Sequence, residues 1–268
     1  MLGLFESIIL GIIQGLTEFL PVSSSGHLEI GKYLLGDESI PEDSLMMTVT
    51  LHFATALSTI VVFWKDIKTL FLGVFRNDKS SVNFTLNILI STIPAVAIGL
   101  IYEEKIESLF NDRLDLVSIM LILTGVLLFI SDIVQKKQLQ VGPVDSIYLG
   151  IAQAIAILPG ISRSGATIST AILLGIDKEK AARFSFLMVI PIIFGKMGKD
   201  ILSIDFSDKM MIEGADWFFP LLLGFISAFI TGMLACKWMI SLVKHSKLKY
   251  FSFYCISIGA IIYLLVKL

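Results

Sequence analysis

The feature that most constrains the fold of this chain is a series of apolar segments, each long enough to cross a lipid bilayer. The hydrocarbon core of a bilayer is about 30 Å thick, so a crossing helix needs about 20 predominantly apolar residues. Lipid offers the backbone no hydrogen-bond partner, and each crossing segment must therefore be helical. Segments of this length lie at about 46–64, 84–102, 116–134, 184–203, 217–236 and 250–267. We therefore expect an all-α integral membrane protein with six transmembrane helices.

The composition agrees with a membrane protein and argues against other classes. The 268 residues are 55% hydrophobic and 16% charged, whereas about 25% of the residues in soluble domains are charged. The formal net charge is −2 and there is no long basic run, so we expect no nucleic-acid partner. Cys236 and Cys255 lie in apolar segments, which predicts buried thiols rather than a disulfide or a metal site. The N-terminus lacks the basic region and cleavage site of a signal peptide.

Two further apolar stretches, 2–36 and 146–176, are interrupted by nearly the same motif. The first contains GIIQGLTEFLPVSSSGH from Gly11, and the second contains GIAQAIAILPGISRSG from Gly150. Neither half of either stretch is long enough to cross the hydrocarbon core. Each stretch therefore predicts a re-entrant pair of short helices, which turns inside the membrane and leaves on the side where it entered. Protein or water must surround such a turn.

Loop charges assign the loops to two sides of the membrane. One alternating set, 64–83, 132–145, 177–183 and 237–249, holds 13 Lys/Arg and 6 Asp/Glu. The other set, 31–45, 103–115 and 196–216, holds 6 Lys/Arg and 14 Asp/Glu. The positive-inside rule makes the first set cytoplasmic and places both termini outside. Successive loops alternate between the two sides of the membrane only if both interrupted stretches are re-entrant and do not cross it.

The parity of the spans predicts an inverted-topology repeat within one membrane domain, 1–268. The half-repeats are about 1–135 and 146–268, and each has one re-entrant pair and three spans. Because three is odd, the second half is inverted relative to the first. The two turns then approach each other from opposite sides and meet near the midplane, as in inverted-repeat transporters.

The first turn carries an acid, a serine cluster and a histidine. Glu18 follows Gln14 by one helical turn, so the two side chains share a helix face. Insertion of a carboxylate into a span costs about 2.5–3.5 kcal/mol. This cost favours a role for Glu18 as a metal ligand or general base over an interfacial side chain. Ser23, Ser24, Ser25 and Gly26 open the next short helix. Free N–H groups there suit a phosphate, and a hydroxyl beside a base is a nucleophile; the alternative is an ordinary serine N-cap. His27 is a candidate general acid–base or nucleophile.

The second turn carries an arginine. Arg163 lies between Ser162 and Ser164, and its guanidinium can bind two phosphate oxygens at once; the alternative is a structural salt bridge to Glu18. Gly165 allows close backbone approach, and Thr167 offers one more hydroxyl.

Outside these two turns there are two further histidines. His52 lies in an apolar run, which favours a satisfied buried core histidine, and His245 lies in a basic loop and is expected to be solvated.

At these motifs the chain resembles the undecaprenyl-diphosphate phosphatase family, also called the bacitracin-resistance family. The resemblance rests on Gln14-x-x-x-Glu18 with the FLPVSSSGH that follows, on PGISRSGAT at 159–167, and on ARFSFL at 182–187 with Pro191. It covers essentially the full length. It implies an enzyme of the bacterial plasma membrane that hydrolyses undecaprenyl diphosphate to undecaprenyl phosphate and phosphate. Such an enzyme recycles the lipid carrier for peptidoglycan synthesis and confers bacitracin resistance.

The resemblance also implies roles for individual residues. By position, the family's proposed nucleophile, essential histidine, essential acid and phosphate-binding arginine are Ser24, His27, Glu18 and Arg163. It implies a divalent cation, Mg²⁺ or Ca²⁺, with Glu18 and Gln14 as candidate ligands, and a site facing the outer side. Ser24 attacking with His27 as base and His27 attacking directly both stay open. A homodimer remains a candidate assembly.

Two other functions compete with hydrolysis of a polyprenyl diphosphate. Inverted repeats with re-entrant helices are also the architecture of transporters, so a lipid-phosphate transporter or flippase is the alternative. The sequence Ser24-Ser25-Gly26-His27 is similar to a core motif of type-2 phosphatidic-acid phosphatases. That family needs a His downstream of its Arg, and after Arg163 the next histidine is His245, which disfavours it.

Overall fold

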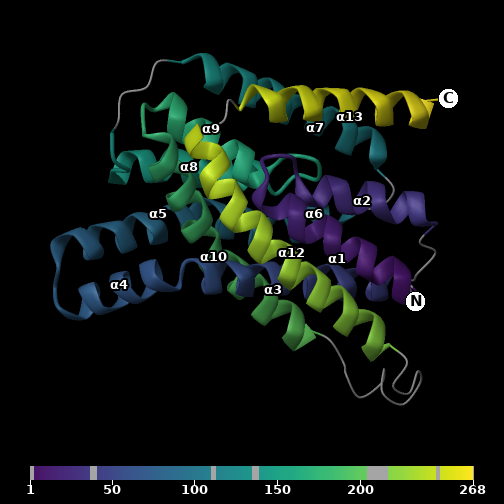
Figure 1. The fold of residues 1–268 in the computed structure, drawn as a ribbon, viewed down its shortest axis with the longest axis horizontal. Coiled ribbons are helices and arrows are strands. Elements are labelled where there is room, and N and C mark those ends of the chain that lie inside the picture. The colour runs from purple at the N-terminus through teal and green to yellow at the C-terminus, as the bar shows by residue number, and fades with distance from the viewer. Residues whose placement is uncertain are drawn as a thin grey trace.

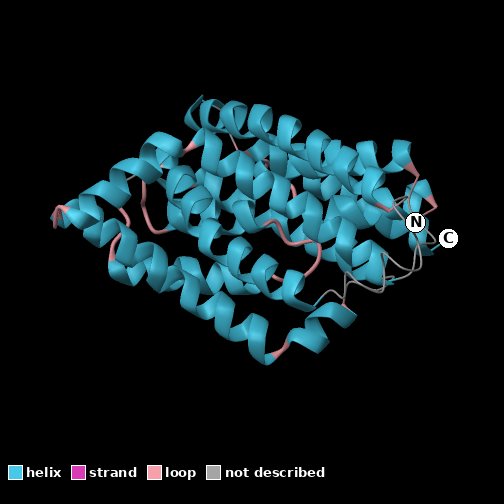
Figure 2. Ribbon diagram, turned by 90° about the horizontal axis from the view of Figure 1, so that it is seen from below, coloured by secondary structure: helices cyan, strands magenta, loops and turns pink. Residues whose placement is uncertain are grey.

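The computed structural model describes residues 3–36, 41–109, 113–134, 139–203, 217–245 and 248–267. Helices make up almost all of these ranges, and short loops join them (Figure 2). The helices are α1 Leu4–Phe19, α2 Ser24–Leu35, α3 Pro41–Val62, α4 Trp64–Phe75, α5 Lys79–Ile101, α6 Glu103–Ser108, α7 Leu114–Ile133, α8 Pro143–Ile155, α9 Arg163–Leu173, α10 Lys178–Ser203, α12 Phe218–His245 and α13 Lys249–Lys267. The expected all-α class is confirmed for the described residues.

Six of these helices, α3, α5, α7, α10, α12 and α13, are long and apolar enough to cross a membrane. They correspond one to one with the six predicted spans. Four extend several residues beyond the predicted limits, because polar turns continue them: α3 begins at Pro41, α5 begins at Lys79, α10 begins at Lys178, and α12 continues to His245. The sequence did not predict α4, an amphipathic helix that follows α3 directly. The chain is a multi-pass membrane protein.

Each interrupted stretch forms two short helices, as predicted: α1 with α2, and α8 with α9. The longest of them, α1, has 16 residues, which is about 24 Å at 1.5 Å per residue and less than the hydrocarbon thickness. Serine N-caps begin the second helix of each pair. The Ser23 hydroxyl accepts from Gly26 N (3.1 Å), and the Ser162 hydroxyl accepts from Gly165 N (3.0 Å). The two repeated motifs therefore also have similar local structures.

Small residues bring the short helices close to spanning helices. α1 packs most extensively on α12, and α8 packs on α5. A Cβ atom at Gly150 of α8 would lie 2.7 Å from the Ser91 carbonyl oxygen of α5. Near the top of Figure 1, α7 and α13 run side by side, and a Cβ at Gly259 would lie 2.6 Å from Ser118 O. Such glycines let helix backbones approach each other inside a membrane.

Gly15→Ala is expected to destabilise the contact between α1 and α12. The new Cβ would lie 2.7 Å from Ala228 O and 2.8 Å from Gly232 N, so the helices must separate. Overpacking of this kind costs about 1–3 kcal/mol, and thermal unfolding in detergent should show a lower Tm. Gly99→Ala is the control, because its Cβ meets no described atom within 4 Å and alanine favours a helix by about 1 kcal/mol. Equal Tm values for the two variants would contradict this packing.

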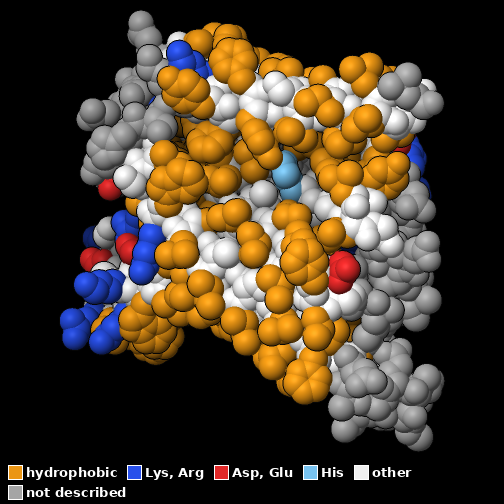
Figure 3. All heavy atoms as spheres, turned by 45° about the vertical axis from the view of Figure 1, so that its right-hand side comes forward, with side chains coloured by type: hydrophobic (Ala, Val, Ile, Leu, Met, Phe, Trp, Pro, Cys, Tyr) orange, Lys and Arg blue, Asp and Glu red, His pale blue; other side chains and the backbone are white. Residues whose placement is uncertain are grey.

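The surface fits a bilayer environment. Apolar side chains cover the middle of the face in Figure 3, and lysine and arginine side chains gather at its left edge. Ile93 of α5 and Leu264 of α13 are 64% and 61% exposed. The start of α1 and the end of α13 lie at one end of the molecule, and the hairpin of α4 and α5 lies at the other (Figures 1 and 2). An apolar belt of this extent is typical of lipid contact.

Polar contacts join loops that the charge pattern assigned to the same side. Lys178 Nζ lies 2.8 Å from Asp132 Oδ1, which also accepts from Leu248 N (3.2 Å). Arg183 Nη2 lies 2.5 Å from Asp66 Oδ1. These contacts link all four loops of the basic set. On the acidic side, Lys199 pairs with Glu103. The four basic loops therefore lie near one another, and their assignment to one side of a membrane stays a prediction.

Candidate active site

The two repeated turns lie against each other, although they are far apart in the sequence. The Ser164 hydroxyl of the second turn donates to the Leu20 carbonyl of the first (3.2 Å). A Cβ at Gly26 would lie 3.2 Å from Gly160 Cα, so the backbones also meet closely. Gly160 has φ +91°, which glycine adopts without strain. The expected meeting of the turns is therefore present in the structure.

Glu18 is the centre of the polar cluster at this junction. Its side chain is buried, and both carboxylate oxygens have partners. Oε2 accepts from Ser24 Oγ (2.7 Å) and from Gln14 Nε2 (3.0 Å), and Oε1 forms an ion pair with Arg163 Nη2. A buried carboxylate needs such donors, because burial of an unpaired charge is costly. Four of the predicted site residues are therefore brought together.

Arg163 forms the salt bridge to Glu18 that the sequence offered as the alternative to phosphate binding. Its Nη2 makes the salt bridge to Glu18, whereas Nη1 is buried and has no hydrogen-bond partner among the described atoms. A buried donor without a partner carries a free-energy cost. An incoming oxyanion would remove that cost, and phosphate binding by Arg163 stays a prediction.

The remaining hydroxyl candidates are already engaged with the protein. Ser23 and Ser162 are N-caps, and Ser164 donates to Leu20 O. The Thr167 hydroxyl bonds to Ser185 Oγ (2.6 Å) and to Arg163 O (2.9 Å). Ser24 and Ser25, by contrast, are partly exposed. These two residues, with the N–H groups that begin α2, are the accessible part of the predicted phosphate site.

His27 is turned away from Ser24. Its Nδ1 lies 2.7 Å from Ser23 O, and its Nε2 lies 2.8 Å from the Tyr254 hydroxyl of α13. The two rings stack at 5.6 Å with an interplanar angle of 10°. Because a carbonyl only accepts, Nδ1 carries the proton, and Tyr254 donates to Nε2 of the neutral ring. Ser24 and His27 share no hydrogen bond in the described chain, and Glu18 occupies the position beside Ser24 that His27 was expected to hold.

His52 is a residue that sequence reasoning missed. It was expected to be a satisfied core histidine, but its side chain is 30% exposed and its Nε2 lies 4.0 Å from Glu18 Oε2. Its Nδ1 bonds to Thr48 O (2.8 Å). One sequence feature could have indicated that His52 belongs to the site. Polar residues repeat at helical spacing along one face of the apolar helix α3: Thr48, His52, Thr55 and Thr59. These residues face α1, since Gln14 Nε2 also reaches Thr55 Oγ1 (3.4 Å).

Comparison with known sequences identifies the family. The sequence model described as "Bacitracin resistance protein BacA" matches residues 7–261. The chain belongs to this BacA family. Proteins named undecaprenyl-diphosphatase are similar over nearly the whole chain. The one from Christiangramia forsetii is 54% identical over 259 residues, 96% of each chain. Those from Bacteroides fragilis and Thermosipho africanus are 46% and 38% identical, and cover 96% and 95% of this chain and 96% and 97% of their own.

The oxygen donors of this BacA site suit a divalent cation that also binds substrate. The described residues contain no cluster of three or more His, Cys, Asp and Glu side chains that would hold a metal ion. Gln14 Oε1 is buried without a described partner, and Glu18 offers a carboxylate. Mg²⁺ typically uses only one or two protein carboxylates together with substrate phosphates. The residues therefore fit a cation held jointly by the protein and a diphosphate.

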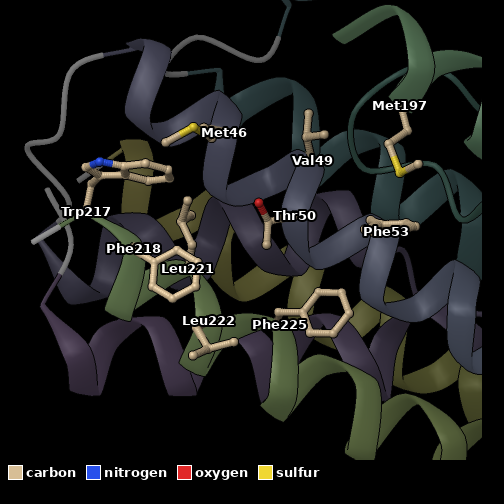
Figure 4. A pocket seen from close by; sticks show the side chains of 10 residues that line it. All are labelled: Met46, Val49, Thr50, Phe53, Met197, Trp217, Phe218, Leu221, Leu222 and Phe225. Atoms are coloured by element: carbon tan, nitrogen blue, oxygen red, sulfur yellow. The ribbon is translucent and has the colours of Figure 1, made fainter. Parts of the chain in front are cut away.

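A separate cavity of about 340 Å³ lies on another face of α3, between α10 and α12 (Figure 4). Met46, Val49 and Phe53 line it from α3, and Phe225 lines it from α12. The described residues that line it are almost entirely apolar, and none of them is charged. A diphosphate needs charged or N–H donors, so this cavity is not the phosphate site of the BacA fold.

Tyr254→Phe is expected to lower the Tm measured by thermal unfolding in detergent. The variant keeps the stacked ring but removes the hydroxyl that bonds to His27 Nε2. An intramolecular hydrogen bond contributes about 0.5–1.5 kcal/mol to stability. Tyr250→Phe is the matched control, because Tyr250 lies on the same helix and is 65% exposed. Equal Tm values for the two variants would show that the hydrogen bond to His27 does not stabilise the protein.

Proposed function

We propose that this chain hydrolyses undecaprenyl diphosphate to undecaprenyl phosphate and inorganic phosphate, the activity for which its relatives are named. One observation carries the chemistry: the Ser24 hydroxyl donates to Glu18 Oε2 at 2.7 Å while Arg163 pairs with the other oxygen of the same carboxylate. A hydroxyl beside a carboxylate is an activated nucleophile, and the neighbouring guanidinium binds the phosphoryl group that it attacks. The product would return to peptidoglycan synthesis.

The reaction would proceed in two displacements at the distal phosphorus. In the first, Ser24 Oγ forms a bond to that phosphorus while its proton passes to Glu18, and the bond to the bridging oxygen breaks. Undecaprenyl phosphate leaves with the bonding electron pair and takes the proton from Glu18, which is then a carboxylate again. In the second, water attacks phospho-Ser24, Glu18 takes the proton of the water, and phosphate leaves as the Ser24 oxygen regains this proton from Glu18. Glu18 thus serves as the base in both steps.

Substrate binding would increase the basicity of Glu18. In the substrate-free site, Arg163 neutralises this carboxylate. A diphosphate carries more negative charge than Glu18 and presents several oxygens to a guanidinium, so it competes for Arg163. When Arg163 turns to the phosphate, Glu18 loses its cationic partner and accepts the Ser24 proton more readily. Activation is thereby coupled to the presence of substrate.

The two helix N-termini and a divalent cation would neutralise the diphosphate. The first N–H groups of α2 and α9 have no intrahelical partner, and each N-terminus carries a partial positive charge. Both helices begin at the junction of the two turns. A Mg²⁺ or Ca²⁺ ion held by Glu18 and Gln14 would supply further charge neutralisation when it is bound.

We also propose the re-entrant, inverted arrangement predicted from the sequence. Lys178 at the start of α10 contacts Asp132 at the end of α7 (2.8 Å), so the segment between them leaves and returns to one side. α1 packs on α12, the second span of the second half, and α8 packs on α5, the second span of the first half. These are equivalent pairs of helices in the two halves, which supports a twofold relation between them. Half-repeats at about 1–135 and 146–268 follow.

The orientation that fits the charges places the site toward the outer side of a bacterial plasma membrane. The loops joined by Lys178, Asp132, Arg183 and Asp66 belong to the basic set, which the positive-inside rule makes cytoplasmic. Both termini would then lie outside. Cysteine labelling at position 3 and position 79 with a membrane-impermeant reagent tests this orientation, and labelling at position 79 alone in intact cells would contradict it.

Phosphate release by purified protein in detergent tests the proposed function. No transport is possible in micelles, so a transporter would release no phosphate there, whereas a phosphatase would. The substrate is undecaprenyl diphosphate, with and without a chelator, and colorimetric phosphate is the readout. We expect release that the chelator lowers and added Mg²⁺ or Ca²⁺ restores. Absence of release in every condition would overturn the proposal.

A further inference from the structure

His52 is fixed in a way that leaves one ring nitrogen available at the candidate active site. Its Nδ1 lies 2.8 Å from the Thr48 carbonyl, which can only accept, so Nδ1 carries the proton. The lone pair is then on Nε2, which lies 4.0 Å from Glu18 Oε2, beyond hydrogen-bond distance. Histidines that bind metals are typically oriented in this way, with the other ring N–H donated to a carbonyl or carboxylate.

We propose that His52 Nε2 is a nitrogen ligand of the divalent cation, which it binds together with Glu18. The inference rests on the proposed use of a cation and goes beyond it by adding a ligand that lies outside both repeated motifs. His52 reaches the site from α3, which brings a third part of the chain to the junction of the two turns.

The distance between the two donor atoms suits a shared ion. Metal–nitrogen and metal–oxygen bonds are each about 2.0–2.2 Å, so two ligands of one ion lie no more than about 4.3 Å apart. The 4.0 Å between His52 Nε2 and Glu18 Oε2 falls within that limit. Gln14 Oε1 is buried without a described partner, and Nε2 of the same amide contacts Glu18 Oε2 (3.0 Å). Because only Glu18 and His52 are strong ligands, phosphate oxygens must complete the coordination.

His27 has no ring nitrogen available to bind a cation. Both of its ring nitrogens already have partners, Ser23 O and the Tyr254 hydroxyl. Among the described residues, His52 is thus the histidine at the site whose second ring nitrogen has no hydrogen-bond partner. An imidazole ligand also changes which metals bind well, because a nitrogen donor is bound better by first-row transition-metal ions than by Mg²⁺ or Ca²⁺, whose usual ligands are oxygens. The site should therefore bind Mn²⁺ more tightly than Mg²⁺.

Pulsed electron paramagnetic resonance of bound Mn²⁺ tests this ligand directly. The purified full-length protein in detergent is loaded with Mn²⁺ and farnesyl methylenediphosphonate, which keeps both phosphorus groups but cannot be cleaved between them. We expect ¹⁴N modulation from a directly bound imidazole, and we expect it to disappear in protein labelled with [¹⁵N]histidine. The labelling changes no side chain, so its result does not depend on how a variant folds.

Single substitutions assign the nitrogen to one of the three histidines. His52→Gln should remove the modulation and raise the Kd for Mn²⁺ about tenfold, with a smaller change for Mg²⁺. His27→Gln and His245→Gln should keep the modulation. If His52→Gln does not fold, modulation that survives in both of the other variants still assigns the nitrogen to His52.

Three results would overturn the inference: no ¹⁴N modulation in the wild type, modulation that persists in His52→Gln, or no binding of Mn²⁺. The proposed function has a separate readout, phosphate release from undecaprenyl diphosphate. Release without ¹⁴N modulation would reject His52 as a ligand and leave the phosphatase intact. Modulation without release would reject the phosphatase and leave the metal site.

Discussion

Phosphate release from undecaprenyl diphosphate is expected to fall by about 100- to 10,000-fold when Glu18 is replaced by glutamine, the range that a general base contributes. The amide has nearly the same shape, so packing against Gln14 and Ser24 is kept. It cannot take a proton from the Ser24 hydroxyl, which donates to Glu18 at 2.7 Å. The loss should therefore appear in kcat, measured as single-turnover release in detergent at saturating substrate.

Asp115→Asn is the matched control for Glu18→Gln. Asp115 forms an ion pair with Arg113, but both side chains are about half exposed: 40% and 48%. Exposed pairs of this kind contribute about 0–1 kcal/mol, and this pair lies outside the two turns. We expect wild-type kcat in the control. If both carboxylate variants lost activity equally, the effect would be general destabilisation rather than loss of the base.

Arg163→Gln is expected to lower kcat/KM by about 100- to 1,000-fold, because it removes the donor for charge that develops on the phosphoryl group. The same substitution leaves the buried Glu18 without its cation. Breaking a buried pair in this way costs about 3–5 kcal/mol of stability. Phosphate release and thermal unfolding should therefore both change, with a clear fall in Tm.

The two effects of Arg163→Gln can be separated. In the double variant Glu18→Gln/Arg163→Gln no buried charge is left unpaired, so Tm should recover toward the wild-type value while activity stays lost. Arg113→Gln, in the exposed pair, should alter neither quantity. Recovery of activity together with Tm would show that Arg163 acts only as a structural partner of Glu18.

The span count could be predicted from the sequence because it depends on length and apolarity, which are local properties. The positions of the helix ends were predicted less accurately than the number of spans. Lys178 begins α10 and pairs with Asp132 of α7, and this tertiary contact lets a polar turn join an apolar helix. The helix α4 was not predicted because Trp64 and Lys65 start an amphipathic helix of 12 residues, which is too short for a span.

At the candidate site as well, features that depend on the local sequence could be predicted, whereas features that depend on tertiary contacts could not. Glu18 and Arg163 could be selected as candidates because each lies in an apolar stretch, where a charged side chain needs a partner. The partners of Ser24 and His27 could not be predicted, since helix direction turns Ser24 to Glu18 and sends His27 to Tyr254 on α13. His52 was misjudged because its apolar neighbours in sequence are not its neighbours in space.

The most direct test of the proposed chemistry follows the distal phosphorus. Wild-type protein and Ser24→Ala are mixed in detergent with undecaprenyl diphosphate that carries ³²P only at the distal position, and the reaction is quenched in acid within one turnover. We predict that label appears on Ser24 of the wild type before it appears as free phosphate, and that Ser24→Ala acquires and releases none. Free labelled phosphate from Ser24→Ala at the wild-type rate would contradict the mechanism.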